Sequence, residues 1–501
     1  MANLKLEDIL RVRPISLFLV APFILFTSKI AVQVIYNLYF HPLRKFPGPK
    51  LWATSELPRA VLRLKGTELW ERLEAHKKYG KVVRISPNDL SWIDEGIWKD
   101  VFAHRQGHDE FMKDISDRTM QPNGYTGILM ADRENHSRYR RLLSYAFSEK
   151  GMKEQQPHII KYVDLLMKDL KGIAGDGPLD LVQWFNFTTF DIIGKLAFGE
   201  DFGCLREGKV HPWIEMIFGN LKSLVIISCM RRLGFEWLLP YLATKKQMIG
   251  RIYNYNFAKS MIDERVKRGS DQKDFWDNVL KHSDKKTGMN QDEMVSNSSN
   301  LVLAGSETTA TLLSGCIYQL CKNPETLKKA TQEIRTAFSS DAEIDLFSTG
   351  QLKYTLAVLE ETMRIYSPVP SQSNRTVPAG GDTVLGYFLP GGTVISFSQH
   401  IANHYPPYWT EPEKFLPERF LGDEKFKNDN FAVMQPFSVG SRNCIGRNLA
   451  YSEMRLILAR FLWNFDVRLD DKMMEGKEWT DQKTYILWEK HPLWAKLTPV
   501  H

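Results

Sequence analysis

The sequence predicts a mostly α-helical protein with a small β region and an N-terminal transmembrane helix. Apolar residues recur at three-to-four spacing in stretches such as "VDLLMKDLKGIA" and "IIGKLAFG", a pattern typical of helices. Short β-rich runs between glycine and proline turns, "NRTV", "DTVLGY" and "GTVISF", indicate a few strands. An apolar stretch near the N-terminus is long enough to cross a bilayer.

The apolar stretch from Pro14 to Phe40 carries a single formal charge, Lys29. As a helix it would be roughly 40 Å long, more than the ~30 Å hydrocarbon core of a bilayer. It lacks the short apolar core and small-residue cleavage site of a signal peptide. We expect a short N-terminal segment at residues 1–13 and a transmembrane anchor at residues 14–40. A helix lying in the membrane interface is the alternative.

The segment "HPLRKFPGPK", residues 41–50, reads as a Pro-rich hinge because its three prolines interrupt any helix. No linker or internal repeat follows, so residues 51–501 are predicted to form one large domain. Residues 51–350 read as mostly helical, with a long helix from about Gln291 to Lys322 that stops before Pro324. Further helices are expected at about Leu352–Tyr366 and from near Gly446 onward.

Charge and cysteine content narrow the classes of function. The net charge of +7 over 501 residues is modest and spread out, which argues against a nucleic-acid partner and suits an anionic membrane surface or an acidic protein. The five cysteines are scattered and none forms a C-x-x-C pair, so a disulfide framework is not expected. Reduced thiols fit a cytosol-facing domain.

One of these cysteines, Cys444, lies in the stretch "PFSVGSRNCIGRNLA". The simplest interpretation is a small buried hydrophobic residue in a turn. The surrounding residues favour a metal ligand instead: Gly440 and Gly446 permit unusual turn angles and a close approach of the backbone to a flat ligand. Amides at the start of the next helix favour a thiolate over a thiol. Arg442 offers a forked donor for a carboxylate.

From Phe437 to Gly446 the pattern F-x-x-G-x-R-x-C-x-G resembles the cysteine-ligand signature of the cytochrome P-450 (P450) family of heme-thiolate monooxygenases. The resemblance extends over roughly residues 35–500. It implies the P450 fold, with heme b between the long helix and the cysteine loop, and residues 51–501 as the catalytic domain. It also implies Cys444 as the axial thiolate ligand of the iron, and Phe437, Gly440, Arg442 and Gly446 as residues that shape the heme site.

A second cluster, "AGSETT", begins at Ala304 inside the long helix. Small residues and threonines in a helix often only permit close packing, but a carboxylate beside a hydroxyl is a costly choice for a buried helix without a purpose. The cluster matches the family's oxygen-side pattern from Ala304 through Thr308. The resemblance implies that Thr308 donates a hydrogen bond on the oxygen side of the heme and that Glu307 relays protons.

The E-x-x-R pair Glu361 and Arg364 is one helical turn apart. Alone it carries little weight, since such pairs are common on solvated faces. Arg419 in "FLPERF" resembles the third member of the family's Glu–Arg–Arg network, which is structural and not catalytic.

Further matches concern the heme propionates. The stretch "HSRYR" places His136 and Arg140 where the family usually has Trp and Arg, so His136 is a departure from the pattern. Arg375 in "NRTV" resembles a further propionate partner, with an ordinary surface arginine as the alternative. His404 in "ANHYPPYW" resembles a family histidine, for which a heme-side contact and a structural role are equally expected.

These features together predict a membrane-anchored monooxygenase that takes electrons from NADPH through NADPH–cytochrome P450 reductase, or from a cytochrome b-type donor. The chain resembles filamentous-fungal enzymes of secondary metabolism, which implies hydroxylation or epoxidation of an apolar small molecule, a terpenoid or a polyketide. Two alternatives stay open: a reductase-independent heme-thiolate isomerase or dehydratase, and a heme-binding sensor. The Glu307–Thr308 pair argues against the sensor, and Thr308 argues against the isomerase or dehydratase.

Four segments are expected to contact the substrate because they mix aromatic and aliphatic residues with few charges, although ordinary core is an equal alternative. They are Met120–Leu129, Cys204–Leu233, Ser367–Ser373 and Thr484–Leu487.

The expected location is the endoplasmic-reticulum membrane, with a single span and a cytosolic catalytic domain. Glycans at the N-x-S/T sites would be incompatible with packing around a heme, since three of the four lie beside or within the predicted site. Three arginines are expected to offer positive charge to the reductase: Arg138, Arg141 and Arg447.

Overall fold

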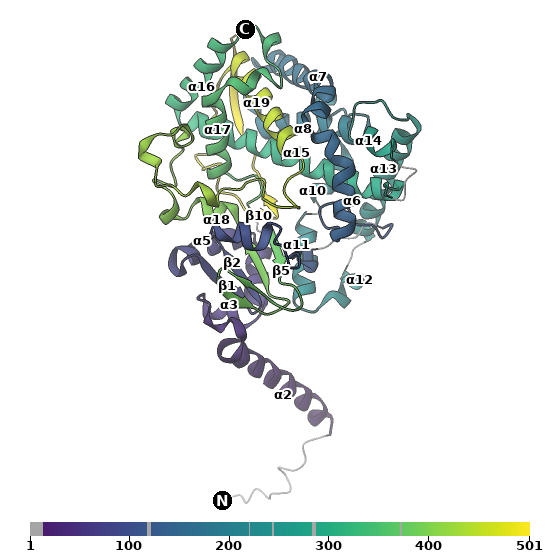
Figure 1. Cartoon of the computed structure of the whole chain (residues 1–501), viewed down its shortest axis with the longest axis vertical. Coiled ribbons are helices and arrows are strands. Elements are labelled where there is room, and N and C mark those ends of the chain that lie inside the picture. The colour runs from purple at the N-terminus through teal and green to yellow at the C-terminus, as the bar shows by residue number, and fades with distance from the viewer. Residues whose placement is uncertain are drawn as a thin grey trace, which may run out of the picture.

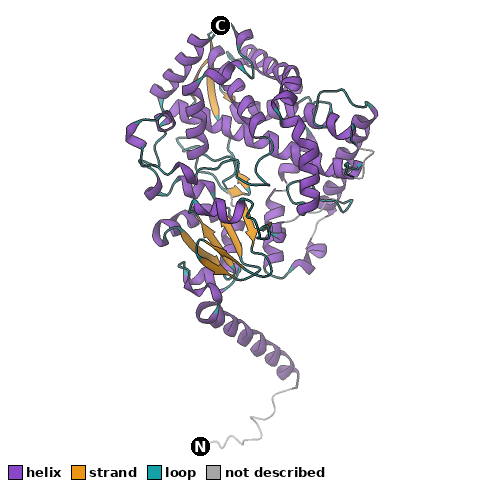
Figure 2. Ribbon diagram, in the orientation of Figure 1, coloured by secondary structure: helices purple, strands orange, loops and turns teal. Residues whose placement is uncertain are grey.

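The computed structural model describes residues 14–117, 122–219, 221–242, 245–282, 287–370 and 373–500. Helices make up most of this part of the chain, and the largest group of strands lies at the end of the body from which α2 emerges (Figure 1 and Figure 2). The predicted mostly α fold class is confirmed. The N-terminal segment expected at residues 1–13 lies outside the described residues.

The helices are distributed along the whole chain. They are α2 (Pro14–Ile35), α3 (Lys50–Thr54), α4 (Leu57–Lys65), α5 (Glu68–Tyr79), α6 (Arg133–Leu143), α7 (Glu149–Ile173), α8 (Leu181–Phe198), α9 (Cys204–Glu207), α10 (Pro212–Gly219), α11 (Leu221–Arg232), α12 (Leu239–Leu242), α13 (Lys245–Lys267), α14 (Asp277–Leu280), α15 (Gln291–Lys322), α16 (Pro324–Ala337), α17 (Lys353–Ile365), α18 (Gln399–Asn403) and α19 (Arg447–Asn464).

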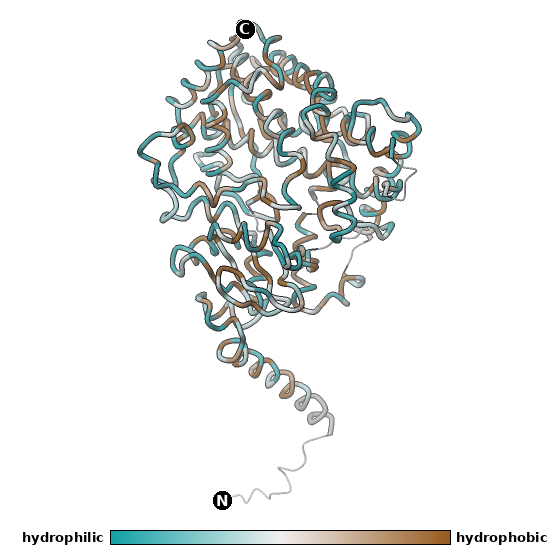
Figure 3. Tube along the Cα trace, viewed as in Figure 1, coloured by the Kyte–Doolittle hydropathy of each residue, from teal (hydrophilic) through white to brown (hydrophobic). Residues whose placement is uncertain are grey.

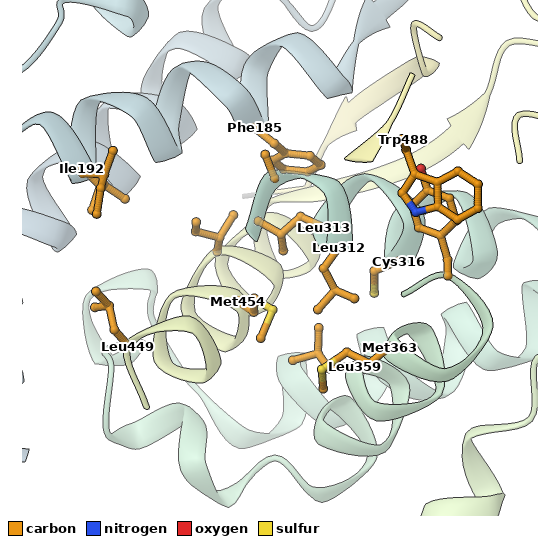
Figure 4. Close-up of a cluster of buried hydrophobic side chains, with 14 of the residues drawn as sticks. Phe185, Ile192, Leu312, Leu313, Cys316, Leu359, Met363, Leu449, Met454 and Trp488 are labelled. Atoms are coloured by element: carbon orange, nitrogen blue, oxygen red, sulfur yellow. The ribbon is translucent and has the colours of Figure 1, made fainter. Parts of the chain in front are cut away.

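Helix α15 runs through the middle of the body and has the predicted bounds. Its N-terminus is a capping box, in which the Asn290 side chain accepts from the Glu293 N–H and the Glu293 carboxylate accepts from the Asn290 N–H. Helices α8, α13, α17 and α19 pack around it. Figure 4 shows the core that results, where Leu312 of α15, Phe185 of α8 and Met454 of α19 converge.

The largest sheet has five strands in the order β1-β2-β8-β5-β3. These strands are β1 (Val82–Ser86), β2 (Asp89–Trp92), β8 (Val394–Phe397), β5 (Ser373–Thr376) and β3 (Met112–Lys113). Strand β2 runs parallel to β8, and the other neighbours are antiparallel. In the short β3–β5 pairing, Lys113 lies directly opposite Arg375. The sheet thus brings Lys113 at its edge beside Arg375, which lies far along the chain.

Smaller sheets complete the β region. They are β4 (Leu179–Asp180) with β12 (Trp494–Pro499) and β9 (Phe465–Leu469), the pair β10 (Thr484–Tyr485) and β11 (Leu487–Trp488), and the pair β6 (Asp382–Val384) and β7 (Tyr387–Leu389).

Two local predictions differ from the structure. The run "DTVLGY" is not one strand but most of a hairpin, since Leu385 (φ 48°) and Gly386 (φ 79°) form a tight turn between β6 and β7. Strands β1 and β2 lie inside the region read as helical, on either side of a turn at Pro87 and Asn88. The turn and the β-branched residues of "VVRIS" were the signals for this hairpin.

Helix α2 projects from the body (Figure 1), and its described side chains from 22 to 33 are exposed. Among the described residues, Pro22–Phe40 and Pro212–Arg232 are long and apolar enough to cross a membrane. The second covers α10 and α11, where Trp213 and Ile214 are buried against the body. Figure 3 shows that hydrophilic segments dominate the outer turns of the body while hydrophobic segments concentrate inside. Because the side chains of α2 from 22 to 33 are exposed while the Pro212–Arg232 stretch is partly buried in the body, α2 is the candidate membrane span.

Candidate functional site

A cavity of about 370 Å³ lies between α15 and the loop that carries Cys444. Ala304 and Thr308 of α15 line one side, and Cys444 lines the other. Ala304 is exposed although it lies in the middle of a core helix, because its methyl group faces this cavity. A ligand held here therefore contacts the thiol on one face and small side chains on the other.

Backbone contacts hold the loop before Cys444 in shape. The Cys444 N–H donates to the Phe437 carbonyl at 2.8 Å, and the Asn443 N–H donates to the Gly440 carbonyl at 3.2 Å. Gly440 has a φ of +77°, and a Cβ there would lie 2.0 Å from the Phe102 carbonyl oxygen. Only glycine fits at this position.

Gly446 differs from Gly440, because its φ of −86° is open to other residues. A Cβ at Gly446 would approach the Cys444 Sγ to 4.0 Å, which is ordinary contact. The expectation that both glycines provide unusual turn angles is thus met only at Gly440. Neither the backbone angle nor the space around position 446 requires glycine in this structure.

Burial, the largest effect, raises the pKa of the Cys444 thiol above its usual value. The Gly446 N–H and the guanidinium groups of Arg140 and Arg447 act in the opposite direction. The Gly446 amide therefore favours the thiolate, as expected, although burial outweighs this effect. A metal at this sulfur would have to displace its proton, as thiolate-bound metals do.

One edge of the cavity is basic. His136 and Arg140, one turn apart on α6, line it together with Arg442 and Lys113. Arg375 of β5 joins His136, Arg140 and Arg442 around a neighbouring cavity of about 480 Å³. Sequence reasoning placed all of these residues near a heme except Lys113, which it missed because the short β3 carries no motif.

Hydrogen bonds fix this basic edge. Arg140 donates to the Asn443 carbonyl at 2.6 Å and so ties α6 to the cysteine loop. Arg442 donates to the Glu110 carboxylate at 2.5 Å. Burial and the nearby Arg442 charge lower the pKa of His136 to about 4, so its imidazole is neutral at physiological pH. His136 can therefore donate a hydrogen bond without adding positive charge.

Glu307 and Thr308 point to different sides of α15. The Thr308 hydroxyl donates to the Ala304 carbonyl at 2.7 Å and lines the 370 Å³ cavity. Glu307 is not among the described residues that line it; its carboxylate pairs with the Lys490 ammonium at 2.7 Å, both groups being buried. Lys490 also donates to the Thr311 hydroxyl at 2.8 Å.

The Glu307–Lys490 pair lines a separate cavity of about 390 Å³, which we call the second cavity. Its walls come from α8, the α10–α11 region and the β10–β11 hairpin. Asn186 on this wall has a buried side-chain oxygen without a hydrogen-bond partner among the described residues, which suits a water molecule. The sequence holds no motif that could have paired Lys490 with Glu307.

Helix α17 carries a buried ion network. The Arg364 guanidinium donates to both oxygens of the Glu361 carboxylate, at 2.7 and 2.8 Å. Arg419 approaches the same carboxylate at 3.4 Å and also pairs with Asp429. The side chains of Glu361, Arg364 and Arg419 are all 0% exposed. The structure thus brings the three predicted members together.

Two further residues are held by contacts within the protein. His404 is not among the described residues that line the cavity; its Nδ1 contacts the His400 carbonyl at 2.8 Å, and burial lowers its pKa to about 3. Arg138 is engaged by the Glu293 carboxylate and is therefore less available to a partner surface.

Of the segments expected to contact the substrate, two reach the 370 Å³ cavity. Ile128 and Leu129 line it from Met120–Leu129, and Val369 lines it from Ser367–Ser373. Residues 120, 121, 371 and 372 of these segments lie outside the described residues.

The other two segments line the second cavity. Ile214 and Leu221 reach it from Cys204–Leu233, and Leu487 reaches it from Thr484–Leu487. Within the described part of the chain, neither segment lines the 370 Å³ cavity, so their expected substrate contact is not supported by this structure. Residue 220 lies outside the described residues.

The sequence is similar to known proteins over nearly its full length. A family model described as Cytochrome P450 matches residues 49–493. Averantin hydroxylase of Dothistroma septosporum is 48% identical over 467 residues, covering 93% of this chain and 88% of that protein. Averantin hydroxylase of Aspergillus parasiticus is 45% identical, with coverage of 93% and 94%. Versicolorin B desaturase stcL of Emericella nidulans is 43% identical, with coverage of 93% and 95%.

Proposed function

The chain belongs to the cytochrome P450 family and is a P450 monooxygenase, and from this premise we propose that it oxidises an apolar fungal secondary metabolite. The observation that carries the proposal is the cavity with Cys444 on one side and Thr308 on the other. Its apolar walls suit a terpenoid or a polyketide. A relative named averantin hydroxylase supports hydroxylation as the first reaction to test, with epoxidation as the second.

We propose heme b as the cofactor, and the residues present fit it. Cys444 provides a sulfur ligand within the cavity, and Gly440 lets its loop pass close to Phe102. Arg140, Arg442 and neutral His136 stand at one edge, where the carboxylates of a heme need donors. Arg375, Phe437 and Gly446 complete the proposed cofactor-binding set.

When bound, the heme supplies the activation of O2 from which one oxygen atom is inserted. The protein's part is to bind, orient and protonate. Ile128, Leu129 and Val369 present apolar surface to the substrate and exclude water. The Thr308 hydroxyl can turn from the Ala304 carbonyl to donate into the cavity.

The proposed route for protons starts outside the 370 Å³ cavity. Glu307 faces the second cavity, and the Lys490 ammonium at 2.7 Å holds its carboxylate in place. We propose that Glu307 takes up protons from water in the second cavity and passes them across α15 toward Thr308. The Thr311 hydroxyl, 3.4 Å from the Glu307 carboxylate, lies beside this route.

Electrons are proposed to come from NADPH through NADPH–cytochrome P450 reductase, or from a cytochrome b-type donor. Arg141 is exposed at the 480 Å³ cavity, and Arg447 is exposed at the start of α19 next to the cysteine loop. Both offer positive charge to an acidic partner.

We propose that residues 14–40 anchor the protein in the endoplasmic-reticulum membrane, that residues 41–50 form a hinge and that residues 51–501 form a cytosolic catalytic domain. The sequon residues Asn297 and Asn374 are 0% and 8% exposed, so a glycan at either site is incompatible with this fold. Protease added to intact microsomes should release the domain, and glycosidase should leave its mass unchanged. Protection from protease would contradict this topology.

The function is tested with the enzyme coexpressed with the reductase and supplied with averantin and with versicolorin B. We expect an oxygenated product whose formation requires NADPH and O2. Conversion without either would favour an isomerase or dehydratase, and a normal thiolate spectrum with no conversion of any metabolite would favour a sensor. Cys444→Ser should lose the thiolate-type CO spectrum; an unchanged spectrum would remove Cys444 as the ligand.

A further inference from the structure

Two cationic side chains lie opposite each other on neighbouring strands, beside the 370 Å³ cavity and the 480 Å³ cavity next to it. Lys113 of β3 and Arg375 of β5 are register partners in an antiparallel pair. Directly opposite residues in such a pair project from the same face of the sheet, with Cβ atoms about 4.5–5.5 Å apart, and like charges there are destabilising. Lys113 lines the 370 Å³ cavity itself. A bound anion would offset this repulsion.

The described protein does not supply that anion. No carboxylate of a described residue lies within 4.0 Å of the Lys113 ammonium, whereas Arg442 already has Glu110 as its partner. The charge of Asp117 acts on Lys113, but its carboxylate accepts hydrogen bonds from the Ser228 hydroxyl and the Asn374 side-chain amide. The cluster is therefore short of negative charge on the side that faces the cavity.

The titration behaviour of Lys113 agrees with this geometry. Burial is the largest effect, and the charges of Arg375 and Arg442 add to it, so that the pKa of Lys113 falls to about 7. Asp117 acts in the opposite direction, and Lys113 in turn lowers the pKa of His136. An anion bound beside these groups would favour the charged form of the lysine.

We propose that Lys113 is a further cofactor-binding residue, which donates a charge-assisted hydrogen bond to a carboxylate of the heme beside Arg375 and Arg442. This rests on the proposed binding of heme in the cavity. The observations favour the heme over an anionic substrate, because Lys113 stands with the arginines of the basic edge, while the part of the wall formed by Ile128, Leu129 and Val369 is apolar.

The test compares the purified holoenzyme with Lys113→Gln, Lys113→Arg and the control Lys99→Gln. Lys99 is an exposed lysine in the turn Trp98–Phe102 and lines none of the cavities described above. The rate of heme transfer to excess apomyoglobin is measured, together with the propionate-bending band in resonance Raman spectra. Replacing the charged ammonium donor by a neutral amide should speed heme transfer about tenfold in Lys113→Gln. Lys113→Arg should transfer heme at close to the wild-type rate but with a shifted propionate band, and Lys99→Gln should be unchanged in both measurements.

Heme transfer at the wild-type rate with an unshifted propionate band in Lys113→Gln would overturn the proposal. So would a variant whose only defect is weaker substrate binding, which would assign the lysine to the substrate. If Lys113→Gln yields no holoprotein, Lys113→Arg carries the test: its different donor geometry should shift the propionate band, and an unshifted band would overturn the proposal. A wild-type protein without a thiolate-type spectrum would instead refute the proposed function.

Discussion

Replacing Arg364 by alanine should remove the centre of the buried ion network on α17. The guanidinium makes two hydrogen bonds to Glu361, at 2.7 and 2.8 Å, and three to the carbonyls of Asn403, Pro412 and Lys414, at 3.0, 2.8 and 3.0 Å. It therefore joins α17 to the segment that leads toward the cysteine loop. Its removal leaves a carboxylate and three carbonyls with fewer partners in a region closed to water.

The size of the effect follows from what remains. Without Arg364, the Glu361 carboxylate keeps Arg419 at 3.4 Å and the Leu416 N–H at 3.0 Å, so it is not wholly uncompensated. Removing one partner of a buried ion pair costs about 3–5 kcal/mol. Because native proteins are stable by about 5–15 kcal/mol, the variant should lose about a fifth or more of its stability.

The assay is urea unfolding of the full-length protein in detergent, followed by circular dichroism and by heme content. Arg206→Ala is the matched control, since Arg206 pairs with Asp201 at 2.9 Å but its side chain is 66% exposed, and surface pairs contribute at most about 1 kcal/mol. Arg364→Lys keeps the charge but not the fork, so it should fall between wild type and alanine. If Arg364→Ala unfolds at the same urea concentration as Arg206→Ala, the network does not stabilise the fold as argued.

Three further predictions concern the cavity. Thr308→Ala should keep heme and substrate affinity but release more hydrogen peroxide per NADPH, because its hydroxyl no longer delivers a proton; unchanged coupling would exclude that role. Burial raises the pKa of Glu453 to about 8 from an ordinary value of 4.5, so the folded protein holds a proton there that the unfolded chain releases, and stability should fall as pH rises between these values. Urea midpoints at about pH 5 and pH 8 should differ less in Glu453→Gln than in wild type, and equal differences would contradict the assignment. Val369→Ala should change product ratios while Leu487→Ala, in the second cavity, should not; the reverse result would exchange the roles of the two cavities.

The sequence by itself determined the features that depend on near neighbours. The bounds of α15 were predictable because Asn290 can cap one end and Pro324 starts the next helix after the other. The cysteine loop was recognisable because glycine, arginine and cysteine occur at fixed spacing, and the structure shows that Gly440 is required by its φ and by the carbonyl of Phe102. Such local signals act over a few residues and do not depend on the rest of the fold.

The tertiary structure alone decided which distant residues meet. Helical spacing sets Glu307 about 100° from Thr308, but only the packing of the C-terminal segment shows that Lys490 lies on the side facing Glu307. The pairing of Lys113 with Arg375 likewise depends on the register of two strands far apart in sequence. The pattern of side chains specifies which face of a helix or strand is buried, but not which element packs against it, because many elements could bury the same apolar area equally well. Which element packs there is decided only when all the helices and strands pack together.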